Sequence, residues 1–88
     1  MQPKEVARWM QTQLEKDECL YQDDVVDMLV KTKREEHLRE NADGNQVLTT
    51  QVLNQFKKLN SDTVVWVGPE KYWRFRVKED EPSRTARG

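Results

Sequence analysis

The chain has few of the residues from which metal sites, disulfides and membrane spans are built. Its 88 residues include one cysteine, Cys19, and one histidine, His37, so no intrachain disulfide can form and no zinc ligand set can be assembled. The longest apolar run, Val64–Val67, is too short to cross a membrane, and no apolar signal segment follows the N-terminus. We therefore expect no metal, no cofactor and no membrane association. A single cysteine also suits a reducing compartment, so we expect a cytoplasmic protein with His37 at its surface.

Motifs for phosphate binding, calcium binding and catalysis are also missing. The three glycines lie far apart, so no glycine-rich phosphate loop is present. The segment Asp43-Gly44-Asn45 is similar to the centre of a calcium loop, but Arg39 and Thr50 occupy the two positions at which such a loop needs a carboxylate. No nucleophile, base and orienting group can be assembled. We therefore predict that the chain is not an enzyme and has no small-molecule substrate.

Charge and aromatic residues are abundant and unevenly distributed. Charged residues make up 35% of the chain and the net charge is −1. Residues 1–40 hold ten Asp and Glu against seven Lys and Arg, whereas residues 41–78 hold three against six. Four aromatic residues lie between Trp66 and Phe75, which predicts a folded C-terminal half, since disordered chains are poor in aromatics. The charge asymmetry indicates a polarised surface, although not the strongly basic one of a dedicated nucleic-acid binder.

Two helices are expected in the first third of the chain. Pro3 suits the first turn of a helix over residues 3–17, whose apolar residues recur at helical spacing. Residues 20–21 suit a short extended piece. Asp23 or Asp24 is the expected N-cap of a second helix. The buried residues of this second helix are expected to be Val25, Met28 and Leu29.

The middle of the chain is less regular. Residues 33–40 are either a solvated extension of the second helix or a short separate helix, and residues 41–45 have the composition of a turn. Thr49 or Thr50 is the expected N-cap of a third helix. Its inward residues are expected to be Val52, Leu53, Phe56 and Leu59.

A β-hairpin is expected to follow, because the period of the apolar pattern changes from 3.6 to 2. Residues 63–67 form its first strand, 68–71 its turn and 72–77 its second strand. In the second strand the alternation separates an apolar face of Trp73, Phe75 and Val77 from a face with Tyr72, Arg74 and Arg76. The chain is therefore read as one domain over residues 1–78 and a disordered tail over residues 79–88.

The predicted class is α+β, with three or four helices followed by a C-terminal two-stranded antiparallel hairpin. This order, over about residues 3–78, resembles the winged-helix fold, a variant of the helix-turn-helix. The chain also resembles a small family of uncharacterised bacterial proteins, a likeness that implies the fold and no established activity. The residues that carry this second likeness are Leu20-Tyr21-Gln22, Gly44-Asn45 ahead of Val52-Leu53 and Phe56, Val64-Val65-Trp66, and Tyr72-Trp73-Arg74.

The leading functional hypothesis is a winged-helix domain that binds duplex DNA or accompanies a DNA-binding assembly. The third helix would enter the major groove, where Asn and Gln recognise adenine edges and Lys meets phosphate or guanine. The basic face of the hairpin would lie along the phosphate backbone, unless its charges only discourage pairing between sheet edges. The candidate residues are Gln51, Asn54, Gln55, Lys57 and Lys58 on the helix and Lys71, Arg74 and Arg76 on the hairpin.

The alternative is a protein-interaction module or homodimer that uses the same fold without nucleic acid. The near-neutral net charge, the acidic N-terminal half and the dense aromatics of the hairpin favour this reading. Its interface would be anchored by Trp66 and Tyr72, if their rings are exposed. A continuous positive surface that joins the third helix to the hairpin would favour DNA instead.

Overall fold

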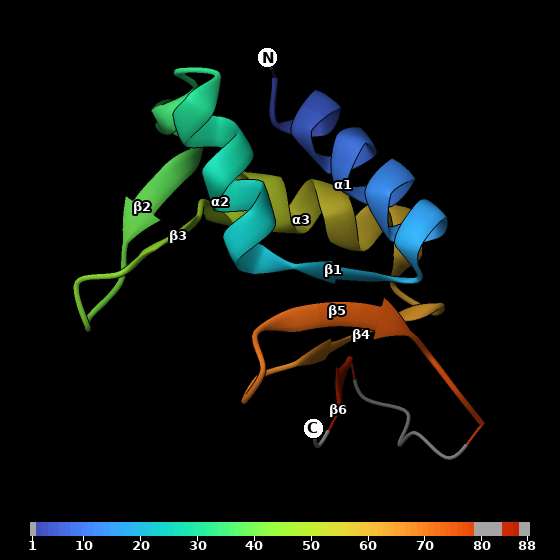
Figure 1. Cartoon of the computed structure of the whole chain (residues 1–88). Coiled ribbons are helices and arrows are strands. Elements are labelled where there is room, and N and C mark those ends of the chain that lie inside the picture. The colour runs from blue at the N-terminus through green and yellow to red at the C-terminus, as the bar shows by residue number, and fades with distance from the viewer. Residues whose placement is uncertain (1, 79–83, 87–88) are drawn as a thin grey trace.

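The computed structural model describes residues 2–78 and 84–86 (Figure 1). Within them, three α-helices combine with short strands, so the predicted α+β class with a C-terminal antiparallel hairpin is confirmed. The helices are α1 (Pro3–Asp17), α2 (Gln22–Lys31), the 3₁₀ turn η1 (Glu35–His37) and α3 (Thr50–Asn60). The strands are β1 (Cys19–Tyr21), β2 (Leu38–Glu40), β3 (Gln46–Leu48), β4 (Val64–Val67), β5 (Tyr72–Phe75) and β6 (Thr85–Ala86).

Four strands form one sheet in the order β1-β5-β4-β6. The hairpin β4–β5 is antiparallel, β1 pairs antiparallel with β5, and β6 pairs parallel with β4. The register aligns Leu20, Trp73 and Trp66 across the three antiparallel strands. Figure 1 shows the three helices together on one side of these strands, while the separate β2–β3 hairpin projects from them.

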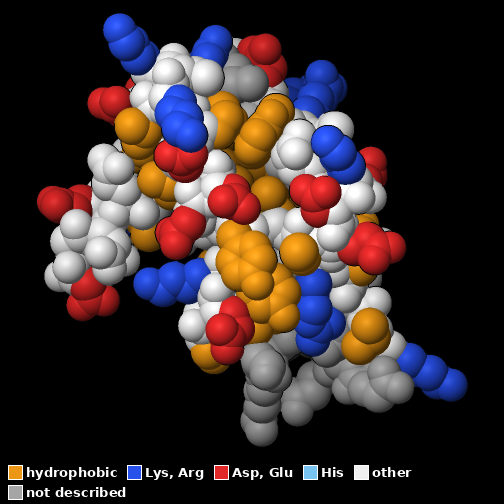
Figure 2. All heavy atoms as spheres, in the orientation of Figure 1, with side chains coloured by type: hydrophobic (Ala, Val, Ile, Leu, Met, Phe, Trp, Pro, Cys, Tyr) orange, Lys and Arg blue, Asp and Glu red, His pale blue; other side chains and the backbone are white. Residues whose placement is uncertain are grey.

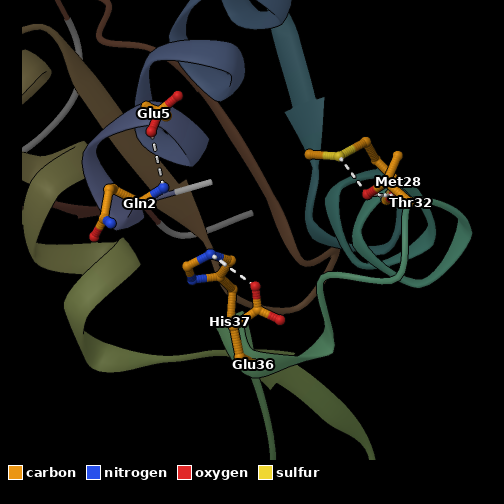
Figure 3. A network of polar contacts seen from close by, with 6 residues as sticks. All are labelled: Gln2, Glu5, Met28, Thr32, Glu36 and His37. Carbon is orange, nitrogen blue, oxygen red and sulfur yellow. Dashed lines mark hydrogen bonds and ion pairs between the residues drawn. The ribbon is translucent and has the colours of Figure 1, made fainter.

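Helix α1 has the bounds that its pattern predicts. Pro3 occupies the first turn, and the Gln2 N–H donates to the Glu5 carboxylate at 3.0 Å, which satisfies one of the free donors at the helix start (Figure 3). At the other end Glu18 adopts a left-handed conformation, with φ 65°, and its N–H donates to the Leu14 carbonyl. The helix packs against α3, and its buried side chains, Leu14 among them, belong to the hydrophobic core.

Helix α2 begins one residue before the predicted caps. Tyr21, the last residue of β1, occupies the N-cap position, and Asp23 and Asp24 lie in the first turn. The predicted N-cap was wrong because strand pairing sets the boundary: the Gln22 N–H donates to the Lys71 carbonyl at 3.0 Å, directly where β1 ends. The two exposed carboxylates still interact favourably with the helix dipole.

The middle segment differs most from the expectation. A short helix is present as η1, but residues 38–40 form strand β2 and pair with β3, Arg39 lying opposite Val47. Asn41 closes the hairpin turn, because its side-chain oxygen accepts from the N–H groups of Asp43 and Asn45 at 3.0 Å each. Gly44 completes it with φ 81°. Leu38, the one strongly apolar residue between residues 33 and 40, is thus a strand residue. A helical pattern could not indicate this.

His37 is buried, with 5% exposure, so its predicted surface position was wrong. Lys33, between the end of α2 and η1, adopts a left-handed conformation with φ 59°, and the Arg34 N–H donates back to the Leu29 carbonyl of α2. The His37 carbonyl then accepts from the Thr49 N–H at 2.9 Å, at the start of α3. Its Nε2 lies 3.7 Å from a Glu36 carboxylate oxygen (Figure 3). The histidine therefore joins the middle segment to α3.

The core lies between the helices and the sheet. Phe56 of α3, with zero exposure, meets the Trp73 ring edge to face at 5.2 Å. Two of the predicted inward residues are exposed instead, Leu59 by 45% and Val77 by 51%. Leu59 lies off the buried stripe of α3, which continues from Phe56 to Asn60, and Val77 lies beyond the end of β5.

The predicted tail is only partly described, because residues 79–83 and 87–88 lie outside the described residues. Residues 84–86 differ from the prediction, since they lie against β4 and extend the sheet. The Trp66 N–H donates to the Arg84 carbonyl at 2.7 Å. Backbone pairing needs no apolar pattern, so the sequence carried no signal for this strand.

The exposures of two leucines generate a stability prediction. We expect Leu48→Ala to lower the free energy of unfolding by about 2–5 kcal/mol, because Leu48 has zero exposure and its removal leaves a cavity. We expect Leu59→Ala to cost less than about 1 kcal/mol. Urea denaturation of the two variants measures both values. Equal losses would contradict the assignment of Leu59 to the surface.

A second prediction concerns the turn between β4 and β5. Lys71 has φ 57°, a left-handed conformation that glycine adopts without steric cost. We expect Lys71→Gly to raise the free energy of unfolding by about 0.5 kcal/mol, although glycine loses more backbone entropy on folding. The matched control is Lys57→Gly in the interior of α3, which should lower it by about 0.5–1 kcal/mol. Thermal unfolding measures both, and a loss at Lys71 as large as that at Lys57 would be inconsistent with strain at the turn.

Candidate nucleic-acid interface

A cavity of about 490 Å³ opens between α3, the β2–β3 hairpin and the β4–β5 hairpin. We call it the cationic pocket. It brings together segments that are far apart in the sequence, from the start of α2 to β6. Its lining residues are Gln22, Arg39, Asn41, Val47, Leu48, Leu53, Asn54, Phe56, Lys57, Trp66, Gly68, Lys71, Trp73, Arg84 and Thr85.

The floor of the cationic pocket is aromatic. Trp66 and Trp73 are partners in the β4–β5 register, so both rings lie on the side of the sheet that faces the helices, with centroids 4.7 Å apart. Trp73 is buried beneath Phe56, whereas Trp66 is only half-buried. Part of the Trp66 indole is therefore available to a planar group in the pocket.

The rim of the cationic pocket carries four positive charges. Arg39 comes from β2, Lys57 from α3, Lys71 from the β4–β5 turn and Arg84 from the residue before β6. No Asp or Glu is among the described residues that line the pocket. Like charges that converge on a recess with apolar walls raise the local concentration of anions.

Arg84 is held in place by neutral acceptors. Its guanidinium donates to the Asn60 side-chain oxygen at 2.8 Å and to the carbonyls of Asn60 and Val64 at 3.3 and 3.2 Å. It also lies 5.9 Å from the centroid of the Phe56 ring. Burial lowers the pKa of Arg84, and the charge of Arg76 lowers this pKa further. Both effects disfavour the charged form of Arg84, whereas a nearby negative charge would favour it.

A second recess lies along the outer side of α3, between that helix and the start of α1. We call it the polar groove. Its volume is about 740 Å³, and again no acidic side chain is among the described residues that line it. Asn54 and Lys57 border both the groove and the cationic pocket. Its lining residues are Gln2, Pro3, Gln51, Asn54, Gln55, Lys57, Lys58 and Ser61.

The sequence matches one family over residues 2–75, and that family is described as a family of unknown function, DUF6953. The chain belongs to this family. Searches of curated proteins and of solved structures gave no match. The family match runs from the N-cap of α1 to the last residue of β5, so it includes α3 and most of the cationic pocket, while Arg84 and Thr85 lie beyond it.

In this DUF6953 member the predicted residues of α3 lie on one surface. Gln51, Asn54, Lys57 and Lys58 are exposed and Gln55 is half-buried, and all five line the polar groove. Lys71 is exposed at the rim of the cationic pocket. The structure therefore brings six of the eight predicted residues to a surface that joins α3 to the hairpin turn.

The two hairpin arginines do not share this surface. Arg74 and Arg76 are half-buried and line neither the pocket nor the groove. Arg74 faces away from the helices, opposite Cys19 and Val65 in the register, and its Nη1 donates to the Phe75 carbonyl at 3.1 Å. The predicted basic hairpin face is thus not an open cationic strip.

The aromatic residues predicted for a protein interface are also separated. Trp66 lies in the floor of the cationic pocket. Tyr72, half-buried, stacks at 5.0 Å on Tyr21 on the opposite side of the sheet, where Tyr21 is 46% exposed. Figure 2 shows hydrophobic side chains gathered near the middle of the molecule and bordered by charged side chains of both signs.

Sequence reasoning missed several members of the site, and three of them are Arg39, Asn41 and Arg84. Arg39 lay in a segment predicted as helical, Asn41 was read only as a turn residue, and Arg84 lay in the predicted tail. The position of Asn41 shortly before Gly44 could have indicated its role in the turn. The positions of the two arginines depend on strand pairing between distant residues, which no local pattern indicates. Among the described residues, no group of three or more His, Cys, Asp or Glu could hold a metal ion. In the same part of the chain, no helix has the length and apolar character of a membrane span.

The anchor of Arg84 generates a prediction. Asn60 is 3% exposed, and it both accepts from Arg84 and donates to the Gln11 side-chain oxygen at 2.7 Å. Asn60→Ala removes the side-chain hydrogen bonds to Gln11 and Arg84. We therefore expect a loss of about 2 kcal/mol or more in the free energy of unfolding. Asn54→Ala, at an exposed position of the same helix, should change it by less than about 0.5 kcal/mol. Urea denaturation compares the two, and similar values would show that the Asn60 network adds no stability.

Proposed function

We propose that the chain is a non-enzymatic, winged-helix-type domain that binds duplex DNA through the outer face of α3. The order of its elements supports this assignment, since α1, α2 and α3 precede the β4–β5 hairpin. The β2–β3 hairpin is then an insertion between the second and third helices, and it contributes Arg39 to the rim of the cationic pocket.

The observation that carries the proposal is the charge of the surface joining α3 to the β4–β5 turn. Five cations and no described carboxylate line the cationic pocket and the polar groove, although the whole chain has a net charge of −1. Phosphate groups of a DNA backbone are the anions that such an extended surface suits, because neutralising them releases bound counterions. The five are Arg39, Lys57, Lys58, Lys71 and Arg84.

In the proposed mechanism, side-chain amides contact the bases and cationic side chains contact the phosphates. Gln51, Asn54 and Gln55 present amide groups along the polar groove, and amides hydrogen-bond adenine edges in the major groove. Lys57 and Lys58 meet phosphates beside them, and Lys71 holds the backbone from the hairpin turn. Arg74 and Arg76 take no part in this version of the mechanism.

The alternative, a protein-interaction module, has weaker support. Trp66 and Tyr72 are half-buried and lie on opposite sides of the sheet, and the exposed aromatic surface beside Tyr72 is that of Tyr21. A cytoplasmic location also belongs to the proposal and is supported by the single free cysteine, Cys19.

The proposal predicts salt-dependent binding in which Lys57 contributes one phosphate contact. Fluorescence anisotropy with a labelled duplex, at several salt concentrations between about 50 and 200 mM, measures the affinity and its slope. We expect Lys57→Gln to weaken binding and to lower the slope of log affinity against log salt by about 1. The matched control is Lys16→Gln, which removes the same charge from an exposed position at the far end of α1 from the groove.

A second variant tests the surface more strongly. Asn54→Asp places a carboxylate where the cationic pocket and the polar groove meet, so we expect at least about tenfold weaker binding with an unchanged fold. Circular dichroism checks the fold. Absence of duplex binding by the wild-type chain at micromolar protein and low salt would overturn the proposal, as would equal effects of the Lys57 and Lys16 variants.

A further inference from the structure

We infer that the cationic pocket receives one unpaired nucleotide of a DNA strand, its base against Trp66 and its phosphate among the rim cations. This inference rests on the proposed function, because it assigns a partner to the pocket beside the duplex-binding face of α3. The argument follows from the size of the pocket, its two kinds of lining and its connection to the polar groove.

The pocket has the size and the floor of a site for a planar ring. Its volume of about 490 Å³ lies within the range of about 300–1,000 Å³ that is usual for small-ligand sites. The half-buried Trp66 indole packs against the buried ring of Trp73. Gly68 borders this indole without a side chain, and a Cβ at that position would lie in ordinary contact with the Trp66 Nε1, at 3.6 Å.

The lining narrows the occupant to a nucleotide. An inorganic anion would meet the cations but leave the aromatic floor uncovered, and a neutral aromatic compound would cover the floor but leave the cations uncompensated. A nucleotide offers a ring that stacks and a phosphate that binds Lys or Arg. The lining also includes the amide residues Gln22, Asn41 and Asn54, and amides carry the donors and acceptors that a base edge requires.

The connection to the polar groove favours a nucleotide within a strand. Asn54 and Lys57 border both recesses, so a backbone that follows the outer face of α3 reaches the pocket without leaving the cationic surface. A base within a duplex is stacked and paired, and therefore cannot enter a pocket unless it is extruded. A nucleotide in a single-stranded overhang can enter without this cost.

The experiment compares three labelled DNAs by fluorescence anisotropy: a blunt duplex, the same duplex with a two-nucleotide 3′ overhang, and that overhang without its bases. We expect the overhang to bind about tenfold tighter than the blunt duplex, because stacking of one base on an aromatic side chain supplies a gain of this order. The abasic overhang should lose this gain. A 2-aminopurine base in the overhang should also lose fluorescence on binding.

A matched pair of variants tests whether the preference for the overhang arises in the cationic pocket. Gly68→Leu fills the space beside Trp66 without changing any charge, and we expect it to abolish the overhang preference and leave blunt-duplex binding unchanged. Gly68→Ala adds one methyl group at ordinary contact distance and should keep the preference. Circular dichroism checks both folds, and if Gly68→Leu does not fold, the abasic overhang on the wild-type chain decides the question.

The outcomes separate this inference from the proposed function. Equal affinity for blunt and overhang duplexes, both salt-dependent, would overturn the nucleotide pocket and leave duplex binding intact. A gain that the abasic overhang retains would also overturn it, because phosphates alone would then explain the preference. Competition by free deoxyadenosine monophosphate at micromolar concentration would overturn the assignment to a strand. Absence of all DNA binding would overturn both proposals.

Discussion

The burial of Trp73 is the constraint on which the rest of the structure depends. Trp73 lies on β5, the strand that pairs with both β1 and β4, and its ring has 4% exposure beneath Phe56. Leu20 of β1 and Trp66 of β4 lie opposite this large ring in the sheet. Helix α3 packs above the ring through Phe56. Aromatic burial of this extent dominates the core of so small a domain.

The site depends on the same packing. Trp66 forms the pocket floor because the register that buries Trp73 turns it to the helix side of the sheet. Asn60, one turn beyond Phe56, is the polar continuation of the buried stripe of α3, and it holds Arg84 at the pocket. A buried amide is tolerated at this position because its bonds to Gln11 and Arg84 offset the cost of removing it from water.

Much of the fold could be predicted from the sequence, and what could not be predicted has a common physical cause. Helix α1 and the β4–β5 hairpin follow from periodicity, turn residues and β-branched runs, which are local signals. Pairing with a distant partner decides β2, β6 and the start of α2, and it overrides local preference there. The candidate site follows the same division: the α3 residues were predictable, whereas Arg39 and Arg84 reach the pocket only through pairing.

The net charge of −1 does not argue against an anion site. Exposed charges separated by more than about 8–10 Å are largely screened at physiological salt, so an anion responds to the charges near it and not to the sum over the chain. Most carboxylates precede Asn41, and none of the described ones reaches the cationic pocket or the polar groove. A chain of balanced composition can therefore limit non-specific attraction while it keeps one surface cationic. Such a surface selects anions by the geometry of its recesses as well as by charge.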